Sequence, residues 1–409
     1  MAGDAPKSNS SYRWVVLMIA WLSYTAVYMV RMTVSPLTPF IVGDLNLSFT
    51  EVGLLTSASA IGYTIAQIPA GWLADRIGVR KMLFLGTFTA GFFALFILVA
   101  QSFASILAIL LIIGLGCGCF PTAAMKAIVQ WFHVRERGTA IGINQTAMNI
   151  AGILIASTLP ALALLLGWRA GFVATGIVSI GFAIVSYILY RERNPASNLM
   201  KSTEVGYARW SKFREVLLNR NILLVSLASL SLCTVEFSLI AYLVLFLKTS
   251  VGMSVALAAG FLAIANGGGA LGKPFFGAIS DRVFGGSRKK PLLLVAVTVA
   301  LTSMLMQLIT ASTSYSVLAI IFAVFGFGAI GWAGLNLVLV SEFVSVDMTG
   351  LAVGYSVTIN LIGNIFGPPV FGFIVDSTGS YTDAWWFLTA SAVASFMFLL
   401  YVREDSRRV

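Results

Sequence analysis

Long apolar runs fill most of this sequence and limit what the chain can fold into. Only 10% of its 409 residues are charged and 58% are hydrophobic, whereas a soluble domain is about 25% charged. Because backbone groups in lipid must hydrogen-bond internally, runs of roughly 20 apolar residues predict membrane-spanning helices rather than a barrel of short alternating strands. We identify twelve such spans, at about residues 14–43, 51–74, 82–101, 104–132, 138–166, 169–190, 220–248, 254–280, 291–311, 315–343, 349–375 and 383–402.

A short charged segment between two of these spans occurs twice. The first copy, GWLADRIGVRK, covers residues 71–81, and a degenerate copy, GAISDRVFGGSRKK, covers residues 277–290. The copies start 206 residues apart, and a second matching pair, GTAIG at 138–142 and GLAVG at 350–354, is 212 residues apart. A repeat at about half the chain length indicates two similar halves. We call the two charged segments hinge 1 and hinge 2.

The twelve spans divide into two sets of six around one polar stretch. We therefore expect an all-α membrane protein with an N-terminal six-helix bundle (1–190), a cytoplasmic linker (191–219) and a C-terminal six-helix bundle (220–409). Within the linker, Trp210 to Leu218 form either an amphipathic helix on the membrane surface or part of a solvated loop.

The positions of the basic residues predict the orientation of the chain in its lipid membrane. The formal charge is +10, and Lys and Arg gather at both hinges, in the linker and near both ends of the chain. Short loops rich in these residues remain in the cytoplasm. We expect a multi-pass protein of the inner or plasma membrane with both termini cytoplasmic. Nucleic-acid binding is not expected, because the basic residues flank apolar runs instead of forming a polar domain.

The sequence lacks the motifs of an enzyme. No phosphate-binding loop is present, and His133, the single histidine, lies beside a loop with no partners for a triad or a metal site. The three cysteines all lie in apolar runs without metal-ligand spacing. We expect no catalytic residues, no bound metal and no cofactor.

Few charged residues lie inside the predicted spans away from their ends, and the clearest are four, Arg31, Lys126, Glu236 and Lys273. A charge at the bilayer centre costs at least about 2.5–3.5 kcal/mol, so such residues usually face the bundle interior and line a pathway. The planar guanidinium of Arg31 suits two-point contact with a carboxylate, although an internal ion pair would also hold it. Lys126 could instead extend to the membrane surface, because it lies near the end of its span.

Glu236 is the one acid among these four. A carboxyl group in apolar surroundings can bind and release a proton, which makes Glu236 our candidate for proton coupling. It could also be a permanent partner of Lys273 or Arg31. Three bases against one acid predict a positive cavity that attracts anions.

Uncharged polar groups are expected to complete the wall of this cavity. In a membrane such side chains also form hydrogen bonds between helices, worth about 0.6 kcal/mol each. The candidates for substrate contact are Tyr28, Tyr63, Gln145, Asn149, Tyr242, Asn266, Trp332, Asn336 and Asn360, and Asn364 belongs to the same polar set.

Hinge 1 resembles the loop signature of the major facilitator superfamily, with Gly71, Asp75, Arg76, Gly78 and a final basic pair all present. Hinge 2 resembles it less closely, because it contains an insertion. This resemblance covers nearly the whole chain. It implies two six-helix bundles around a central cavity that opens alternately to the two sides of the membrane.

The hinge charges are expected to form a gate. Asp75 can accept hydrogen bonds from a helix N-terminus and pair with a base such as Arg137. A network of Asp75, Arg76, Arg137, Asp281 and Arg282 would close the cytoplasmic side and break when that side opens. The alternative is that these charges only set the orientation of the chain in the membrane. That role requires basic residues, however, and does not account for the acids Asp75 and Asp281.

A further stretch, FPTAAMKAIVQWF at 120–132 followed by RERG at 135–138, resembles the organic-anion branches of the superfamily, which include anion:cation symporters and monocarboxylate carriers. Tyr28 and Arg31 match a pair that such carriers use on a substrate carboxylate, although Val30 replaces the acid common beside this Arg. Lys273 lies where several of them place a binding or gating Arg.

We therefore expect a secondary active transporter that carries a small organic anion, a monocarboxylate or sugar acid, as a monomer, with a proton as the co-substrate of a symport or exchange. The alternative is a proton-driven exporter of drugs or metabolites. Such an exporter would need an acidic cavity, which the excess of embedded bases disfavours.

Overall fold

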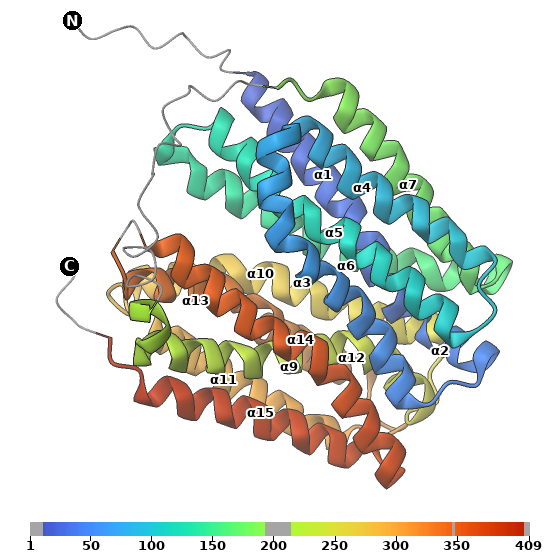
Figure 1. Ribbon diagram of the computed structural model, residues 1–409. Coiled ribbons are helices and arrows are strands. Elements are labelled where there is room, and N and C mark those ends of the chain that lie inside the picture. Colours follow the sequence, from blue (N-terminus) through green and yellow to red (C-terminus); the bar gives the residue numbers. More distant parts are fainter. Residues whose placement is uncertain (1–10, 193–213, 346–347, 405–409) are drawn as a thin grey trace, which may run out of the picture.

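The computed structural model describes residues 11–192, 214–345 and 348–404, and these form α-helices joined by short turns (Figure 1). The helices of the first half are α1 (Tyr12–Met32), α2 (Val34–Leu45), α3 (Phe49–Ile77), α4 (Val79–Leu95), α5 (Phe103–Trp131), α6 (Val134–Leu166) and α7 (Trp168–Leu189). Those of the second half are α9 (Arg220–Thr249), α10 (Val255–Arg282), α11 (Lys289–Leu305), α12 (Tyr315–Gly331), α13 (Ala333–Glu342), α14 (Thr349–Thr378) and α15 (Tyr381–Tyr401).

Eleven helical segments in the described residues are long and apolar enough to cross a membrane. The remaining crossing element is α3, which has 29 residues but carries several hydroxyl and amide side chains. It packs between α5 of its own half and α14 of the other half, so its polar groups can face protein instead of lipid. With α1–α2 and α12–α13 each counted as one span, the twelve predicted helices are confirmed.

Two of the spans predicted as continuous are broken. The first breaks at Thr33, where α1 ends and α2 begins. Pro36 has no N–H to donate to the carbonyl four residues earlier, so the helical hydrogen bonding is interrupted there. The other break is at Trp332, between α12 and α13. Both breaks lie next to embedded charged residues of the site described below.

The buried apolar side chains form two main clusters. One comes mostly from α1–α7 and the other mostly from α9–α15, and we call these parts the N half and the C half. Of the predicted linker, residues 193–213 lie outside the described residues, and so does the start of the proposed amphipathic helix. Its described end, residues 214–218, is helical, and Val216 packs into the core of the C half.

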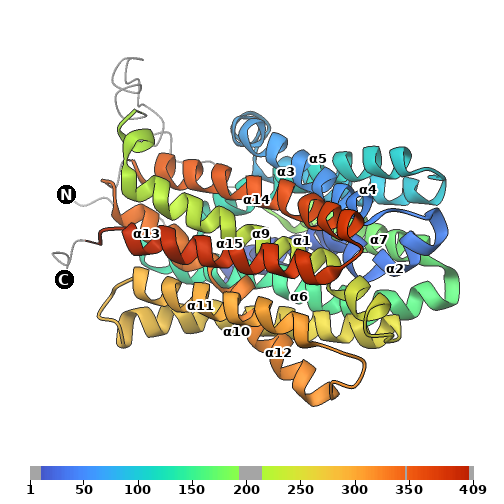
Figure 2. The same ribbon diagram turned by 90° about the horizontal axis from the view of Figure 1, so that it is seen from below.

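The two halves meet along two seams. One seam is formed by α3 and α14, and the other by α6 and α10 (Figure 2). Within each half, one helix pair approaches very closely through glycine. A Cβ atom on Gly62 of α3 would lie 2.0 Å from a carbonyl oxygen of α5, and one on Gly326 of α12 would lie 1.9 Å from the Ala265 oxygen of α10. The repeat seen in the sequence is thus also a repeat of backbone packing.

Replacing Gly326 with valine is expected to disrupt the C half, since the side chain would overlap backbone that cannot move independently. Overpacking of this kind costs about 1–3 kcal/mol or more. Thermal unfolding in detergent measures the loss. Gly260→Val is the matched control, because a Cβ on Gly260 of α10 meets nothing within 4 Å. Equal unfolding temperatures for the two variants would contradict this account of the packing.

The halves are bonded to each other at the end of the bundle opposite the hinges, which we call the far end. There Asp376 of α14 accepts hydrogen bonds from the backbone of Phe49 and Thr50 at the start of α3, at 2.9 and 2.7 Å. Tyr242 donates to the Phe49 oxygen at 2.5 Å, and Ser57 donates to a carbonyl oxygen of α14 at 2.5 Å. At the hinge end, the ion pairs that the structure shows each join residues of one half.

Candidate functional site

Arg31 lies in the last turn of α1, just before the break at Thr33, and is 6% exposed. Its guanidinium carbon is 4.1 Å from the ring centre of Tyr63 and 5.4 Å from that of Tyr28. The ring centre of Phe237, from the C half, is 5.9 Å from the same carbon. Aromatic faces stabilise a buried cation, but within the described part of the chain no carboxylate forms an ion pair with Arg31. The site therefore holds a positive charge that an anion can neutralise.

A small cavity lies against Arg31 where the two halves meet. Its volume of about 20 Å³ holds a single water molecule, so the site is almost closed in this conformation. The lining comes from α1, α2, α3, α9 and α14 and consists of Arg31, Met32, Val34, Ser35, Thr56, Ser59, Phe237, Ile240 and Asn364. The cavity thus combines one cation with hydroxyl groups and one amide.

Asn364 of α14 provides that amide. It is 1% exposed, and neither its side-chain oxygen nor its side-chain nitrogen has a hydrogen-bond partner. A buried polar group without a partner costs about 1–3 kcal/mol. An amide can both donate and accept, so a ligand hydroxyl in the cavity would satisfy it.

Glu236 is buried in the middle of α9, at 4% exposure. The indole nitrogen of Trp332 donates a hydrogen bond to its carboxylate at 3.1 Å, and the break between α12 and α13 brings Trp332 to this place. The acid predicted to lie inside a span is therefore buried in the C half. Trp332 is also a predicted substrate-contact residue, and in this conformation its indole bonds to Glu236.

Lys273 of α10 contacts the opposite half. Its ammonium donates to the side-chain oxygen of Asn149 on α6 at 2.6 Å. The amide nitrogen of Asn149 donates in turn to the backbone oxygen of Asn266 at 3.2 Å. Three predicted site residues therefore meet at the seam between α6 and α10, away from the cavity at Arg31.

Lys126 of α5 bonds to hinge 1. Its ammonium contacts Asp75 at 2.5 Å and the Gly71 carbonyl oxygen at 2.9 Å, so it does not line the cavity at Arg31. The expected pairing of Asp75 with Arg137 is replaced, because Arg137 donates to two backbone carbonyls at the end of α5. Arg76 stacks on the ring of Trp72 at 3.7 Å.

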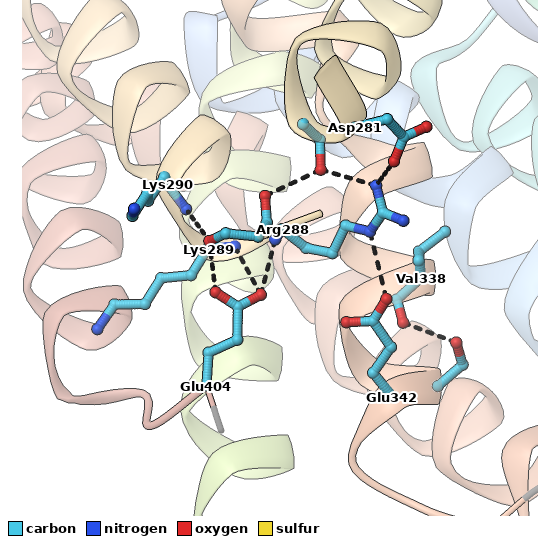
Figure 3. A network of polar contacts seen from close by, with 10 residues as sticks. Asp281, Arg288, Lys289, Lys290, Val338, Glu342 and Glu404 are labelled. Atoms are coloured by element: carbon cyan, nitrogen blue, oxygen red, sulfur yellow. Dashed lines mark hydrogen bonds and ion pairs between the residues drawn. The ribbon is translucent and has the colours of Figure 1, made fainter. Parts of the chain in front are cut away.

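Hinge 2 forms its network around Arg288, which sequence reasoning did not single out (Figure 3). Arg288 bonds to Asp281, to Glu342 at 3.2 Å and to the Ser280 hydroxyl at 2.7 Å. Burial alone would lower the pKa of the Arg288 guanidinium, but its bonds to the two carboxylates raise that pKa above its ordinary value. Arg282, a predicted gate residue, is exposed.

An acid at the end of each half anchors the helix that follows its hinge. Glu192 accepts from the backbone nitrogens of Val79 and Arg80 at 2.9 and 3.0 Å. Glu404 accepts from the backbone nitrogens of Arg288 and Lys289 at 2.7 and 3.4 Å (Figure 3). A carboxylate is stabilised at a helix N-terminus by free N–H groups and by the helix dipole.

The remaining predicted contact residues do not border the cavity at Arg31. Tyr242 is fully buried and bonds to backbone oxygens at the far end, and Asn336 donates to Ser356 within the C half at 3.4 Å. Gln145 is exposed and Asn360 is partly buried. The cavity is lined in addition by Ser35, Thr56, Ser59 and Phe237, which sequence reasoning missed because ordinary residues on three different helices carry no common motif.

Comparison with known proteins identifies the family. The model of the Major Facilitator Superfamily matches residues 20–368 and, in a second match, residues 268–409. The chain belongs to this superfamily and is a membrane transporter rather than an enzyme. A probable galactarate/D-glucarate transporter of Bacillus subtilis is 28% identical over 98% of this chain and 94% of its own length. A hexuronate transporter of the same organism is 25% identical over 95% and 93%. A probable sulfoacetate transporter of Cupriavidus necator is 26% identical over 92% and 90%.

Solved structures show the same fold. A bacterial homologue of the human lysosomal transporter Spinster, in an inward-facing and occupied conformation, has a TM-score of 0.78 at 20% identity and covers 98% of this chain and 97% of its own. A D-xylose-proton symporter also has a TM-score of 0.78, at 16% identity, and covers 97% of this chain and 99% of its own.

Proposed function

We propose that this protein transports a small polyhydroxylated organic anion, a sugar acid, across the plasma membrane by alternating access. The observation that carries the proposal is Arg31, a buried cation without a carboxylate partner in the described residues, which borders a cavity between the halves. A substrate carboxylate would pair with its guanidinium in two-point contact.

The other cavity groups favour a substrate with hydroxyl groups. Ser35, Thr56, Ser59 and Asn364 line the cavity beside Arg31, and Asn364 has unsatisfied donors and acceptors. A plain monocarboxylate would leave these groups unpaired, whereas the hydroxyls of a sugar acid would bond to them. The named substrates of the similar transporters, galactarate, glucarate and hexuronate, support the same class.

The charge balance argues against the alternative, an exporter of lipophilic cations. With Lys126 paired to Asp75, the remaining embedded charges are Arg31, Lys273 and Glu236 in the described spans. This excess of positive charge attracts anions and repels cations.

The proposed cycle follows from where the halves are bonded. They are joined at the far end, while the ion pairs at the hinge end stay within each half. With the hinges and both termini on the cytoplasmic side, this is an inward-facing state. The bundles 1–190 and 220–409 would rock as units around the site within one monomer, with 191–219 as the linker. Glu236 would carry the co-transported proton.

Ligand-induced stabilisation of the purified protein in detergent tests the substrate class. Galactarate, glucarate, hexuronates and sulfoacetate are compared with neutral sugars and a lipophilic cation. A ligand at 100 times its Kd adds about 2.7 kcal/mol to the free energy of unfolding, which appears as a higher melting temperature. Stabilisation by sugar acids, followed by their uptake into proteoliposomes, is expected. Stabilisation by the neutral sugars or the cation alone would overturn the proposal.

A further inference from the structure

The seam between α6 and α10 contains a lysine that lies near a buried acid. Lys273 bonds across the seam to the neutral amide of Asn149. Its neighbour Gly272 packs against Gly331, where a Cβ atom would lie 3.0 Å from the Gly272 Cα. The residue after Gly331 is Trp332, which donates to Glu236, so the Glu236 carboxyl group lies in the same part of the C half as Lys273. Lysine has a compact charge on a flexible four-carbon stem, so its ammonium can move between neighbouring acceptors.

The local structure suits such a movement. Pro274 follows Lys273 inside α10, and a proline in a helix interior removes a backbone hydrogen bond and permits a bend. The contact itself is close, because a Cβ on Gly152 of α6 would lie 2.3 Å from the Asn266 side-chain oxygen. Loss of the bond to Asn149 would therefore act directly on a tightly packed point between the halves.

The competition has a clear direction. An ionised carboxylate attracts an ammonium group more strongly than an amide dipole does, and low-dielectric surroundings increase the difference. A protonated carboxyl group loses most of this attraction. The other titratable or charged groups that act on Glu236 in the described residues are Arg31 from α1 and Cys233 of α9, and neither forms the seam contact.

We propose that Lys273 is a two-position switch that couples the proton to the seam. With Glu236 protonated, Lys273 bonds to Asn149 and holds the inward-facing state. When the Glu236 carboxyl group releases its proton to the cytoplasm, the carboxylate attracts Lys273, the seam contact is lost and the halves return to the outward-facing state. This inference rests on the proposed proton-coupled cycle and adds the residues that link protonation to movement.

The distance between the hinge ends of α6 and α10 tests the switch. Two cysteines for spin labels, Thr139→Cys and Val283→Cys, are introduced at exposed positions. The three native cysteines are replaced by alanine. The distance between the labels is then measured by pulsed electron paramagnetic resonance from pH 5 to pH 9. Acidic pH is expected to favour the long distance, and alkaline pH the short one. Glu236→Gln should keep the long distance at every pH, and Lys273→Met should lose the pH response.

Asn149→Ala should favour the short distance even at acidic pH. Asn144→Ala is the matched control, since Asn144 is also a buried asparagine of α6 but lies outside the contact with Lys273, and it should behave as the wild type. A pH response that persists in Glu236→Gln or Lys273→Met, or an Asn149→Ala variant that matches the control, would overturn the switch. Ligand stabilisation by sugar acids, measured on the same samples, tests the proposed function separately.

Discussion

Replacing Arg31 with alanine is expected to abolish detectable binding of the sugar acid while the empty protein remains folded. Truncating one partner of a buried charge pair costs about 2–5 kcal/mol, so the affinity should fall by roughly 30-fold to 5,000-fold. The empty protein loses a buried charge that lacks a carboxylate partner in the described residues, so its melting temperature should not fall. Ligand-induced stabilisation of purified protein measures both effects.

Two further variants make this test specific. Arg31→Lys keeps the charge but loses the planar fork, so its affinity should lie between those of the wild type and the alanine variant. Lys126→Met removes another embedded base, which the structure pairs with Asp75, and it should leave ligand-induced stabilisation unchanged. Unchanged binding in Arg31→Ala, or equal losses in Arg31→Ala and Lys126→Met, would contradict the site at Arg31.

Replacing Asp376 with alanine is expected to open the far end. The Asp376 carboxylate accepts three hydrogen bonds from the start of α3, from the Phe49 nitrogen and from the nitrogen and hydroxyl of Thr50. It thus acts as an N-terminal cap supplied by the opposite half. Removing a cap costs about 0.5–2 kcal/mol, and because this bond exists only when the far end is closed, the ratio of outward-facing to inward-facing protein should rise by roughly 2-fold to 30-fold.

The opening is measured by labelling Ser59→Cys, in the cavity lining, with a thiol reagent added from outside the cell. Labelling should be faster in Asp376→Ala and intermediate in Asp376→Asn, which keeps one acceptor oxygen. Asp383→Asn is the control. Asp383 is an exposed acid at the same end of the protein, but it lies in the first turn of α15. If Asp376→Ala labels no faster than this control, Asp376 does not hold the far end closed.

The far-end bonds and the cavity are close in the structure. Ser57 donates across the seam to the Ile365 oxygen, while their sequence neighbours Thr56 and Asn364 line the cavity. Separation of α3 from α14 would therefore widen the cavity and expose it on the same side. In the proposed cycle, the site that is too small for a sugar acid in this conformation would then admit one from the outside.

The helices and the embedded charges were predictable because both depend on local sequence. A run of about 20 apolar residues must cross the membrane as a helix wherever its neighbours lie. Arg31 and Glu236 were identified because placing an ionisable residue inside the membrane costs free energy, and such residues usually have a function. The structure confirms that both are buried. The repeat of the hinges likewise predicted two similar halves before any contact was known.

The partners of these charges were decided by the tertiary structure. Lys126 and Arg31 look alike in the sequence, yet one lies beside Asp75 and the other among aromatic rings. In the sequence, Asp376 is an ordinary acid near the end of a helix. Only the packing of α14 against α3 places its carboxylate at the N-terminus of α3 in the opposite half. Membrane insertion depends on each stretch of the chain by itself. A binding site or a gate depends on distances between segments hundreds of residues apart, and only the packing of the two halves determines those distances.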